Sequence, residues 1–222
     1  MSAEYTATAT SLRSAGVMLT FALVFTAIMA STYQWTRPDI EAARAAEKMK
    51  LVDAVLPPDR YDNQPLEDVV LLGPTPALGL AEGGRIYRAT RGGAPAALIV
   101  ETAAPDGYGG RIDLLVAIGA DDRIAGVRAV GHRETPGLGD YIDPRKDRNK
   151  TAPWIRQFEG LATEGGAGLK VKKDGGQIDY RVGATISARA VTNAVARAAA
   201  WARTHRSALM AAAPGATLEG ER

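Results

Sequence analysis

The amino-acid sequence of 222 residues contains no cysteine and only two histidines. The absence of thiols excludes disulfides, iron–sulfur ligation, thiolate zinc sites and cysteine nucleophiles. His132 and His205 are too few for a histidine-rich metal site, so we predict no bound metal. Any redox chemistry of this chain must therefore use an organic cofactor.

The sequence also lacks an excess of charge of either sign. Lys and Arg number 27 and Asp and Glu 25, which leaves a net charge of +2. Such a balance offers no broad electrostatic surface for nucleic acid, and we expect no nucleic-acid partner. The hydrophobic share of 46% is sufficient for one globular domain and a short additional element.

A long uncharged run lies near the N-terminus. No charged residue occurs within 14–36, and 17–30 is almost wholly apolar. A helix that spans a bilayer needs about 20 such residues, and Tyr33 and Trp35 fall where interfacial aromatic side chains would anchor its far end. The run therefore predicts a transmembrane helix over 14–36.

The alternative for this run is a cleaved signal peptide, whose apolar region is typically about 7–15 residues. Ala30 could precede a cleavage site, but Ile28 is larger than the small residue that is usual two positions earlier. The length of the run and the size of Ile28 favour an uncleaved anchor.

The basic residues around this run are distributed unevenly. Arg13 precedes it, whereas Arg37, Arg44, Lys48 and Lys50 follow it. By the positive-inside rule alone, the main domain would stay in the cytoplasm.

The soluble part begins with a segment rich in helix formers. We predict a helix over 39–56 that begins at Asp39 as N-cap, directly after Pro38, and is ended by the pair at 57–58. A loop-rich stretch follows, so that 37–84 forms a helical and loop connector.

Strand patterns then occur in series. They lie at 85–90, 96–102, 111–118 and 123–130, and 119–122 is a hairpin connection between the last two. Successive hairpins predict an antiparallel sheet. Further elements are expected as follows: a short helix over 151–159 with Trp154 and Phe158 as a core contact, a second hairpin from 169–172 and 177–182, and a long helix over 187–210.

The predicted fold class is therefore α+β, with antiparallel hairpins packed against helices and one transmembrane helix before them. The predicted domains are a short cytoplasmic tail at 1–13, the transmembrane helix at 14–36, the connector at 37–84, the main domain at 85–210 and a flexible tail at 211–222.

One segment, 179–187 (DYRVGATIS), reads as a strand that passes through two small residues into a helix start. Thr185 then lies where backbone N–H groups are unpaired and the helix dipole is positive, which favours a phosphate. Gly183 and Ala184 leave room for one. The alternative is that Thr185 or Ser187 only caps the helix.

A second segment, 131–139, follows a strand directly. Pro136 and Gly137 fit the centre of a type II turn, and Gly139 adds a permissive position. Such a loop can turn several N–H groups toward one ligand edge, although it could also be an ordinary turn. His132 is interpreted as structural.

A third segment, 105–110 (PDGYGG), lies between two strands and by itself is only a loop with glycines. The order of the three segments is more informative than any one of them. The full series is 106–110 (DGYGG), the hairpin at 121–122, 132–139 (HRETPGLG), 174–176 (DGG) and 179–187.

This series resembles the FMN-binding domain of the G subunit of the Rnf electron-transport complex of prokaryotic membranes. The related domain in the C subunit of the sodium-translocating NADH:quinone oxidoreductase is similar. The resemblance covers the chain from the membrane anchor through the long helix. The length favours the Rnf member, because the quinone-reductase protein is usually longer.

The resemblance implies that FMN is joined covalently, through its phosphate, to Thr185 by a dedicated flavin transferase. The family's recognition pattern is an aspartate, two variable residues, a Ser/Thr-like position and then Gly-Ala-Thr. Val182 departs from it at the Ser/Thr-like position but leaves the acceptor intact. The matching residues are Asp179, Gly183, Ala184 and Thr185, with Ser187 at a following hydroxyl position.

The resemblance also implies a loop close to the isoalloxazine ring. N–H donors in this loop would favour the reduced flavin and raise its potential without a side-chain charge. The loop residues are Glu134, Thr135, Gly137, Leu138 and Gly139.

The function implied is that of a membrane-anchored flavoprotein subunit that relays electrons through FMN in an ion-translocating ferredoxin:NAD oxidoreductase complex, a translocase. No catalytic acid or base is required for that step. The implied partners are the membrane and iron–sulfur subunits of the complex, the flavin transferase and the lipid bilayer. The chain itself shows no G-x-G-x-x-G after a strand, and we expect it to bind neither NAD nor ferredoxin.

The implied location is the bacterial inner membrane, with a single span and the main domain on the periplasmic side. Free FMN would be scarce there, so a covalent tether retains the cofactor, and this consideration outweighs the charge count. Two alternatives stay open: the C subunit of the quinone reductase, and a non-redox anchored binding module in which Thr185 is only a helix cap.

Overall fold

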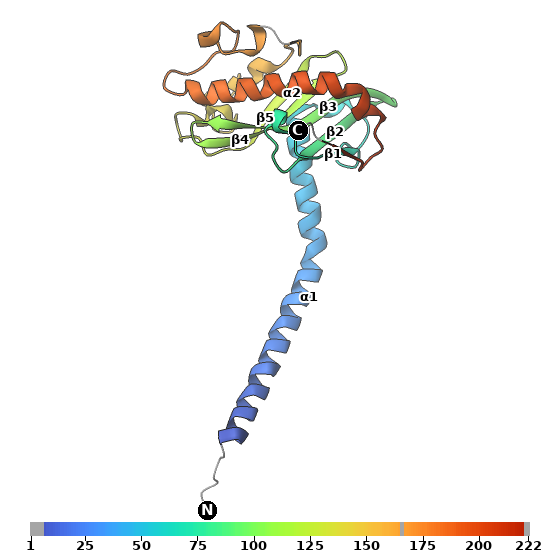
Figure 1. Ribbon diagram of the computed structural model, residues 1–222, viewed down its shortest axis with the longest axis vertical. Helices are drawn as coiled ribbons and strands as arrows, with labels where there is room; N and C mark the ends of the chain where they lie inside the picture. Colours follow the sequence, from blue (N-terminus) through green and yellow to red (C-terminus); the bar gives the residue numbers. More distant parts are fainter. Residues whose placement is uncertain (1–6, 165–166, 220–222) are drawn as a thin grey trace, which may run out of the picture. The chain divides into compact units, whose positions relative to one another are not determined.

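The computed structural model (Figure 1) describes residues 7–164 and 167–219. It divides into two compact units, Met1–Glu47 and Lys48–Arg222. The outermost residues of the predicted tails, 1–6 and 220–222, lie outside the described residues. The division falls within the predicted connector 37–84, whose later part belongs to the second unit and contributes a strand to its sheet.

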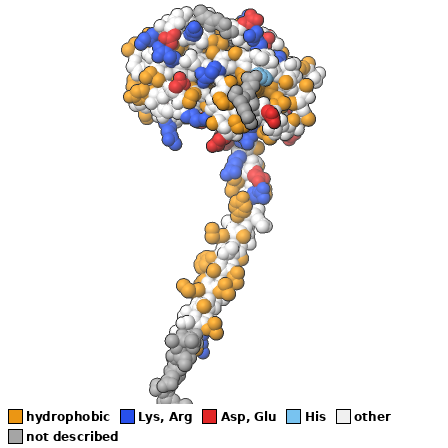
Figure 2. Space-filling model, viewed as in Figure 1, with side chains coloured by type: hydrophobic (Ala, Val, Ile, Leu, Met, Phe, Trp, Pro, Cys, Tyr) orange, Lys and Arg blue, Asp and Glu red, His pale blue; other side chains and the backbone are white. Residues whose placement is uncertain are grey.

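The first unit consists of most of helix α1 (Ala7–Val55). Its most apolar 18-residue stretch has a mean hydropathy of 1.9, and Leu19 and Phe25 are 62% and 60% exposed. Hydrophobic side chains cover this part of the helix in Figure 2. At about 1.5 Å per residue, residues 14–36 extend about 35 Å, enough for a hydrocarbon core of about 30 Å. The helix is therefore long and apolar enough to cross a membrane, as predicted.

The predicted helix break at Pro38 is wrong. Helix α1 continues through Pro38, and Asp39 lies inside it instead of capping a second helix. Proline removes only one N–H donor and one intrahelical bond, whereas the segment 39–56 is rich in Ala, Glu and Lys, which favour the helix. The helix does stop before Pro57 and Pro58, as predicted.

The second unit is built on one six-stranded sheet of order β5-β4-β3-β2-β1-β6. All neighbouring strands are antiparallel except β1 and β6, which are parallel. The four strands predicted between 85 and 130, the hairpin connection at 119–122 and the α+β class are confirmed. The strands are β1 (Val69–Leu72), β2 (Gly84–Arg91), β3 (Ala94–Gly107), β4 (Gly110–Gly119), β5 (Ile124–Gly131) and β6 (Thr217–Leu218).

Strand β3 is longer than predicted. It extends to Gly107, which pairs with Gly110 at the start of β4, so Tyr108 and Gly109 form the turn between them. Gly110 has a φ of +98°, which a residue with a side chain rarely adopts. The segment 105–110 is therefore a tight hairpin tip and not a loose loop.

The two faces of the sheet carry separate apolar clusters, because successive side chains of a strand point to opposite faces. Helix α2 (Thr185–Ala211) lies across one face (Figure 1), where Val191 and Val195 are fully buried. The last turns of α1 cover part of the other face, and Val52 and Val55 pack there with Ile99.

Arg88 fixes the C-terminal end of α2. Its side chain is buried, forms an ion pair with Asp68 and donates hydrogen bonds to the carbonyls of Leu209 (3.0 Å) and Ala212. The last carbonyls of a helix lack intrahelical donors and carry partial negative charge. The Arg88 guanidinium supplies both the missing hydrogen-bond donors and a positive charge.

Six short 3-10 helices connect the main elements in the described part of the chain. The predicted helix over 151–159 is the one that begins at Trp154, whose ring contacts Phe158 edge-on at 5.6 Å between centroids. Both side chains are buried, which confirms the core contact. The 3-10 helices are Pro58–Arg60, Pro76–Leu78, Asp140–Ile142, Trp154–Phe158, Ala167–Leu169 and Lys172–Asp174.

The predicted second hairpin (169–182) is wrong. In its place the structure has two 3-10 turns and one parallel bridge, between Val171 and Ile178. Gly175, at a φ of +82°, ends the second turn. A Cβ at Gly176 would lie 2.0 Å from a backbone oxygen. The glycines thus fold this part of the chain into a compact loop.

The described part of the predicted flexible tail (211–222) belongs to the sheet instead. Ala211 ends α2, and strand β6 then pairs with β1. The amides of Leu71 and Gly73 donate to carbonyls of this segment at 2.9 Å. Backbone pairing of this kind cannot be recognised from two residues of sequence.

Gly126 in β5 allows the last turn of α1 to lie close to the sheet, since a Cβ there would be 2.3 Å from the Val55 carbonyl oxygen. We expect Gly126→Ala to lower the free energy of unfolding by about 1–3 kcal/mol, because the main chain must shift. Thermal unfolding of the detergent-purified chain, followed by circular dichroism, measures this. The matched control is Gly131→Ala on the same strand, where the nearest atom is a movable Asp113 carboxylate oxygen at 3.1 Å. Equal unfolding temperatures for the two variants would contradict the close approach.

Candidate functional site

Thr185 is the first residue of the 27-residue helix α2, and Ala184 occupies the N-cap position. The first bond of the helix runs from the Ala188 amide to the Ala184 carbonyl (3.4 Å). The amides of residues 185–187 therefore have no acceptor within the helix, and the dipole places partial positive charge there. This end of α2 is suited to an anion such as a phosphate.

The interpretation of Thr185 or Ser187 as a simple helix cap is wrong. The N-cap position makes no side-chain hydrogen bond. The Ser187 hydroxyl donates to the Glu134 carboxylate, and no hydrogen bond within the described residues engages the Thr185 hydroxyl. That hydroxyl lies partly exposed at an open helix terminus.

The chain enters α2 through a turn and not through the predicted strand. The Ala184 amide donates to the Arg181 carbonyl at 3.0 Å, and Gly183 has a φ of +88°. A Cβ at Gly183 would lie 3.4 Å from Leu138 Cδ1. The loop 134–139 and the entrance of α2, which are about 45 residues apart in sequence, are therefore neighbours in space.

The loop 134–139 contains the predicted turn, with Gly137 at a φ of +75°. The amides of Gly137, Leu138 and Gly139, however, are bound by acceptors in or next to the loop. The Gly137 amide donates to Asp140 Oδ1 at 2.9 Å, and those of Leu138 and Gly139 donate to the Thr135 carbonyl at 3.1 and 3.0 Å. The expectation that these N–H groups point to a ligand edge is thus not met, because nearer acceptors bind them.

Glu134 joins the three segments that the sequence singles out. The residue is 4% exposed; its Oε1 accepts the Gly109 amide of the hairpin tip at 3.0 Å, and its Oε2 accepts the Ser187 hydroxyl of α2. A Cβ at Gly139 would lie 2.7 Å from Oε2. A buried carboxylate is stable only with such hydrogen bonds, so Glu134 holds the hairpin tip and α2 against its own loop.

Large apolar side chains are exposed around Thr185. Val182 is 91% exposed and Ile186 is 47% exposed, and Leu138, which contacts the entrance of α2, is 43% exposed. Tyr108, in the hairpin tip that Glu134 binds, is 67% exposed. Exposed apolar side chains are therefore present at the entrance of α2, on the loop 134–139 and on the hairpin tip that Glu134 binds.

Asp179, the first residue of the predicted recognition pattern, is accessible. Its side chain is 62% exposed and forms an ion pair with Lys172 at 2.5 Å. An exposed carboxylate six residues before Thr185 can be reached by another protein.

Arg181 is fixed between an aromatic ring and a buried carboxylate. Its guanidinium lies 4.5 Å from the centroid of the Tyr141 ring and pairs with Asp147. Burial by itself would raise the pKa of the Asp147 carboxyl, but the amides of Trp154 and Asn149 and the Arg181 guanidinium hold that pKa below its ordinary value. Burial raises the pKa of Tyr141, so its hydroxyl stays protonated.

Tyr141, Asp147 and Gln157 are site residues that the sequence did not reveal, and Trp154 was predicted only as core. All four contact the segment 179–184 or Arg181 from a part of the chain more than 20 residues away. The one local signal is Asp147, whose Oδ1 accepts the Asn149 amide (3.0 Å), a turn typical of aspartate.

His132 is structural, in keeping with the prediction. Its Nδ1 accepts the Glu134 amide at 3.2 Å, and its Nε2 lies 3.9 Å from Asp143 Oδ2. Within 7–164 and 167–219, no group of three or more His, Cys, Asp or Glu residues could hold a metal ion.

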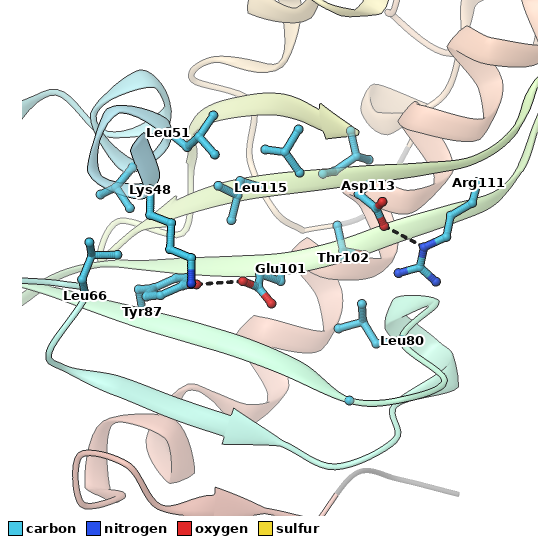
Figure 3. A pocket seen from close by; sticks show the side chains of 14 residues that line it. Lys48, Leu51, Leu66, Leu80, Tyr87, Glu101, Thr102, Arg111, Asp113 and Leu115 are labelled. Atoms are coloured by element: carbon cyan, nitrogen blue, oxygen red, sulfur yellow. Dashed lines mark hydrogen bonds and ion pairs between the residues drawn. The ribbon is translucent and has the colours of Figure 1, made fainter. Parts of the chain in front are cut away.

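A cavity of about 340 Å³ lies on the other face of the sheet (Figure 3). The Tyr87 hydroxyl points to Glu101 there, at 2.7 Å, and Arg111 pairs with Asp113. None of the predicted site residues lines this cavity. The cofactor site predicted around Thr185 is therefore a surface site and not the cavity.

The lowered pKa of Asp147 predicts that the free energy of unfolding depends on pH. Its ionised form stabilises the fold above the unfolded-state pKa of about 3.8, and this stabilisation is lost as the pH falls through the lower folded-state pKa. We expect Asp147→Asn to lower the free energy of unfolding by about 1.5–3 kcal/mol at pH 7, the value of hydrogen bonds to a charged group. The difference from wild type should narrow below about pH 4. Urea unfolding at pH 7 and pH 3.5 measures it, with the exposed Asp59→Asn as control; a difference that is independent of pH would contradict the assignment.

Comparisons with known proteins agree with this geometry. Residues 107–200 match the FMN-binding domain family, and residues 1–55 match the RnfG N-terminal region. The G subunit of the ion-translocating oxidoreductase complex of Pseudoalteromonas atlantica is 38% identical over 198 residues, which cover 88% of this chain and 90% of the relative. The G subunit from Shewanella loihica is 39% identical over 89% of this chain and 92% of its own length. The G subunit from Pseudomonas aeruginosa is 40% identical over 90% of this chain and 92% of its own length.

The matched regions contain the anchor helix, the Glu134 loop and the entrance of α2. Identity at this level over nearly the whole length shows common descent and a shared fold. The chain therefore belongs to the family of G subunits of ion-translocating oxidoreductase complexes.

Proposed function

We propose that this chain is the FMN-carrying, membrane-anchored subunit of an Rnf-type complex, and that FMN is bound covalently to Thr185. The observation that carries the proposal is the Thr185 hydroxyl itself. It lies at the open, positive end of α2, takes no part in capping, and completes the pattern that begins at the exposed Asp179.

The attachment reaction needs an activated flavin. Condensing FMN with a threonine would release water and is unfavourable in water, so the donor is a flavin dinucleotide that contains a diphosphate. The Thr185 oxygen forms a bond to the flavin-side phosphorus, the P–O bond of the diphosphate breaks, the nucleoside monophosphate leaves, and the hydroxyl proton passes to a base of the transferase. Asp179 is a recognition residue for that enzyme.

The residues at the site fit a flavin phosphate. The open amides at 185–187 and the helix dipole favour its charge. Gly183 presents no side chain, and a bulkier residue there would meet Leu138. Ala184 is 4% exposed and closes the inner side of the turn.

The apolar part of the cofactor would lie near the loop that Glu134 holds. Thr135 and Gly137 are exposed on this loop, as is Leu138, while Gly139 allows the loop to approach Ser187. The exposed Val182 and Ile186 add apolar surface on the other side of Thr185. When bound, FMN supplies reversible acceptance of one or two electrons.

Electron relay requires proximity and no general acid or base. A cofactor on the surface of the domain can approach redox groups of other subunits, and we propose the membrane and iron–sulfur subunits of the complex as its partners. This role makes the chain an electron-transfer subunit of a translocase. Membership of the G-subunit family favours the Rnf complex over the quinone reductase.

We propose that α1 crosses the bacterial inner membrane once and that the flavin domain lies in the periplasm. A covalent tether retains a cofactor where free FMN is scarce. The basic residues after the span, Arg37, Arg44, Lys48 and Lys50, oppose this orientation by the positive-inside rule, and we give retention of the cofactor more weight.

Flavin attachment is tested at Thr185. In protein produced together with the transferase, the peptide that contains Thr185 should gain about 440 Da, the mass of FMN less one water. Thr185→Val should abolish this gain and the in-gel flavin fluorescence, yet leave the thermal unfolding temperature nearly unchanged, because Thr185 makes no cap. The matched control is Thr204→Val, which removes an exposed threonine hydroxyl of the same helix and should keep the flavin. Fluorescence that persists in Thr185→Val would mean that another residue is the acceptor.

Orientation is tested by thiol labelling, because the chain has no cysteine of its own. Ser207→Cys lies on an exposed position of α2, and Ser11→Cys lies on the other side of the predicted span. In intact spheroplasts a membrane-impermeant maleimide should label Ser207→Cys at once and Ser11→Cys only after permeabilisation. The reverse order would place the flavin domain in the cytoplasm.

A further inference from the structure

We propose that Tyr141, Trp154 and Gln157 are positioning residues that hold the segment 179–184 in the conformation that the flavin transferase binds. This inference rests on the proposed attachment of FMN to Thr185. It adds the part of the fold that presents the acceptor, which the recognition pattern itself does not contain.

Trp154 and Gln157 bind the main chain at the start of the segment. The Trp154 indole N–H donates to the Asp179 carbonyl at 2.5 Å, and Gln157 Oε1 accepts the Asp179 amide at 2.8 Å. Both polar atoms of the Asp179 backbone are therefore fixed, while its carboxylate is left exposed beside Lys172.

Tyr141 binds the main chain at the end of the segment. Its hydroxyl accepts the Arg181 amide at 3.3 Å and donates to the Ala184 carbonyl at 3.4 Å. Since Ala184 is the N-cap of α2, this hydroxyl binds the residue directly before Thr185. Arg181 covers the same ring and pairs with Asp147, which fixes the middle of the segment.

These side chains form a rigid support for the segment because they are core residues. Tyr141 is 1% exposed and Trp154 is 6% exposed, and their rings meet edge-on at 5.3 Å between centroids. The segment 179–184 has no strand partner of its own within the described residues. Without this support the segment 179–184 would sample many conformations, and ordering one residue costs about 1–2 kcal/mol in backbone entropy.

Preorganisation of the segment should appear in the transfer kinetics. A transferase that must recognise an aspartate and a threonine in one geometry binds only the fraction of acceptor molecules that adopt it, and the apparent affinity falls with that fraction. Loss of a positioning contact should therefore raise KM for the acceptor protein and change kcat little.

The test uses the full-length chain in detergent, purified from a host without the transferase and then incubated with transferase, Mg²⁺ and flavin adenine dinucleotide. Tyr141→Phe removes the hydroxyl and keeps the ring under Arg181. We expect its KM to rise about fivefold, the factor that corresponds to one ordinary hydrogen bond. Gln157→Leu, which removes the acceptor for the Asp179 amide, should have a similar effect and serves if Tyr141→Phe unfolds. Peptide mass measures the rate of flavin transfer, and circular dichroism measures folding.

The matched control is Tyr87→Phe. Tyr87 is 5% exposed and also donates one hydroxyl hydrogen bond, to Glu101 at 2.7 Å, on the other face of the sheet (Figure 3). The transferase should attach flavin to the Tyr87→Phe variant with the wild-type KM. Wild-type KM in folded Tyr141→Phe and Gln157→Leu, or an equal rise in Tyr87→Phe, would overturn the positioning role. Failure of the wild-type chain to gain flavin at Thr185 would instead overturn the proposed attachment.

Discussion

The arrangement of the site depends on one buried carboxylate. Glu134 accepts hydrogen bonds from the Gly109 amide and the Ser187 hydroxyl, and these bonds offset the cost of burying its side-chain oxygens. The bonds fix a hairpin tip and a helix terminus against the loop 134–139. The close approach is possible because Gly139 has no side chain. The contact of Leu138 with the entrance of α2 follows from this arrangement.

Helix α2 is held at both ends, and its position decides where Thr185 lies. At the C-terminal end Arg88 binds the last carbonyls and pairs with Asp68. At the N-terminal end Ser187 binds Glu134. The face between them consists of small and branched apolar residues packed on the sheet. These contacts hold both ends of the helix, so they set where its open amides and the Thr185 hydroxyl lie on the surface.

Several residues around Thr185 are exposed, and the apolar cluster and the cavity on the other face of the sheet lie apart from them. The apolar cluster around Val52 and Val55, and the cavity beside Tyr87, contain none of the residues around Thr185 that the resemblance implied. Several residues near Thr185 are exposed, and exposed apolar side chains accompany them. An enzyme that must exclude water needs an enclosed site, whereas the proposed covalently tethered electron carrier needs access to its partners.

The sequence by itself determined the features that depend on near neighbours along the chain. These are the absence of thiolate chemistry, the apolar run at 14–36, the strand alternation between 85 and 130, the Pro136–Gly137 turn and the spacing from Asp179 to Thr185. Only the tertiary structure decided that α1 continues through Pro38, that 169–182 is not a hairpin and that the amides of residues 137–139 are already bound. It also decided that Glu134 binds Ser187 and that Tyr141 binds the segment 179–184. Local steric preferences of a few neighbouring residues determine a turn or a strand. A hydrogen bond between segments forty residues apart forms only after packing has brought the segments together.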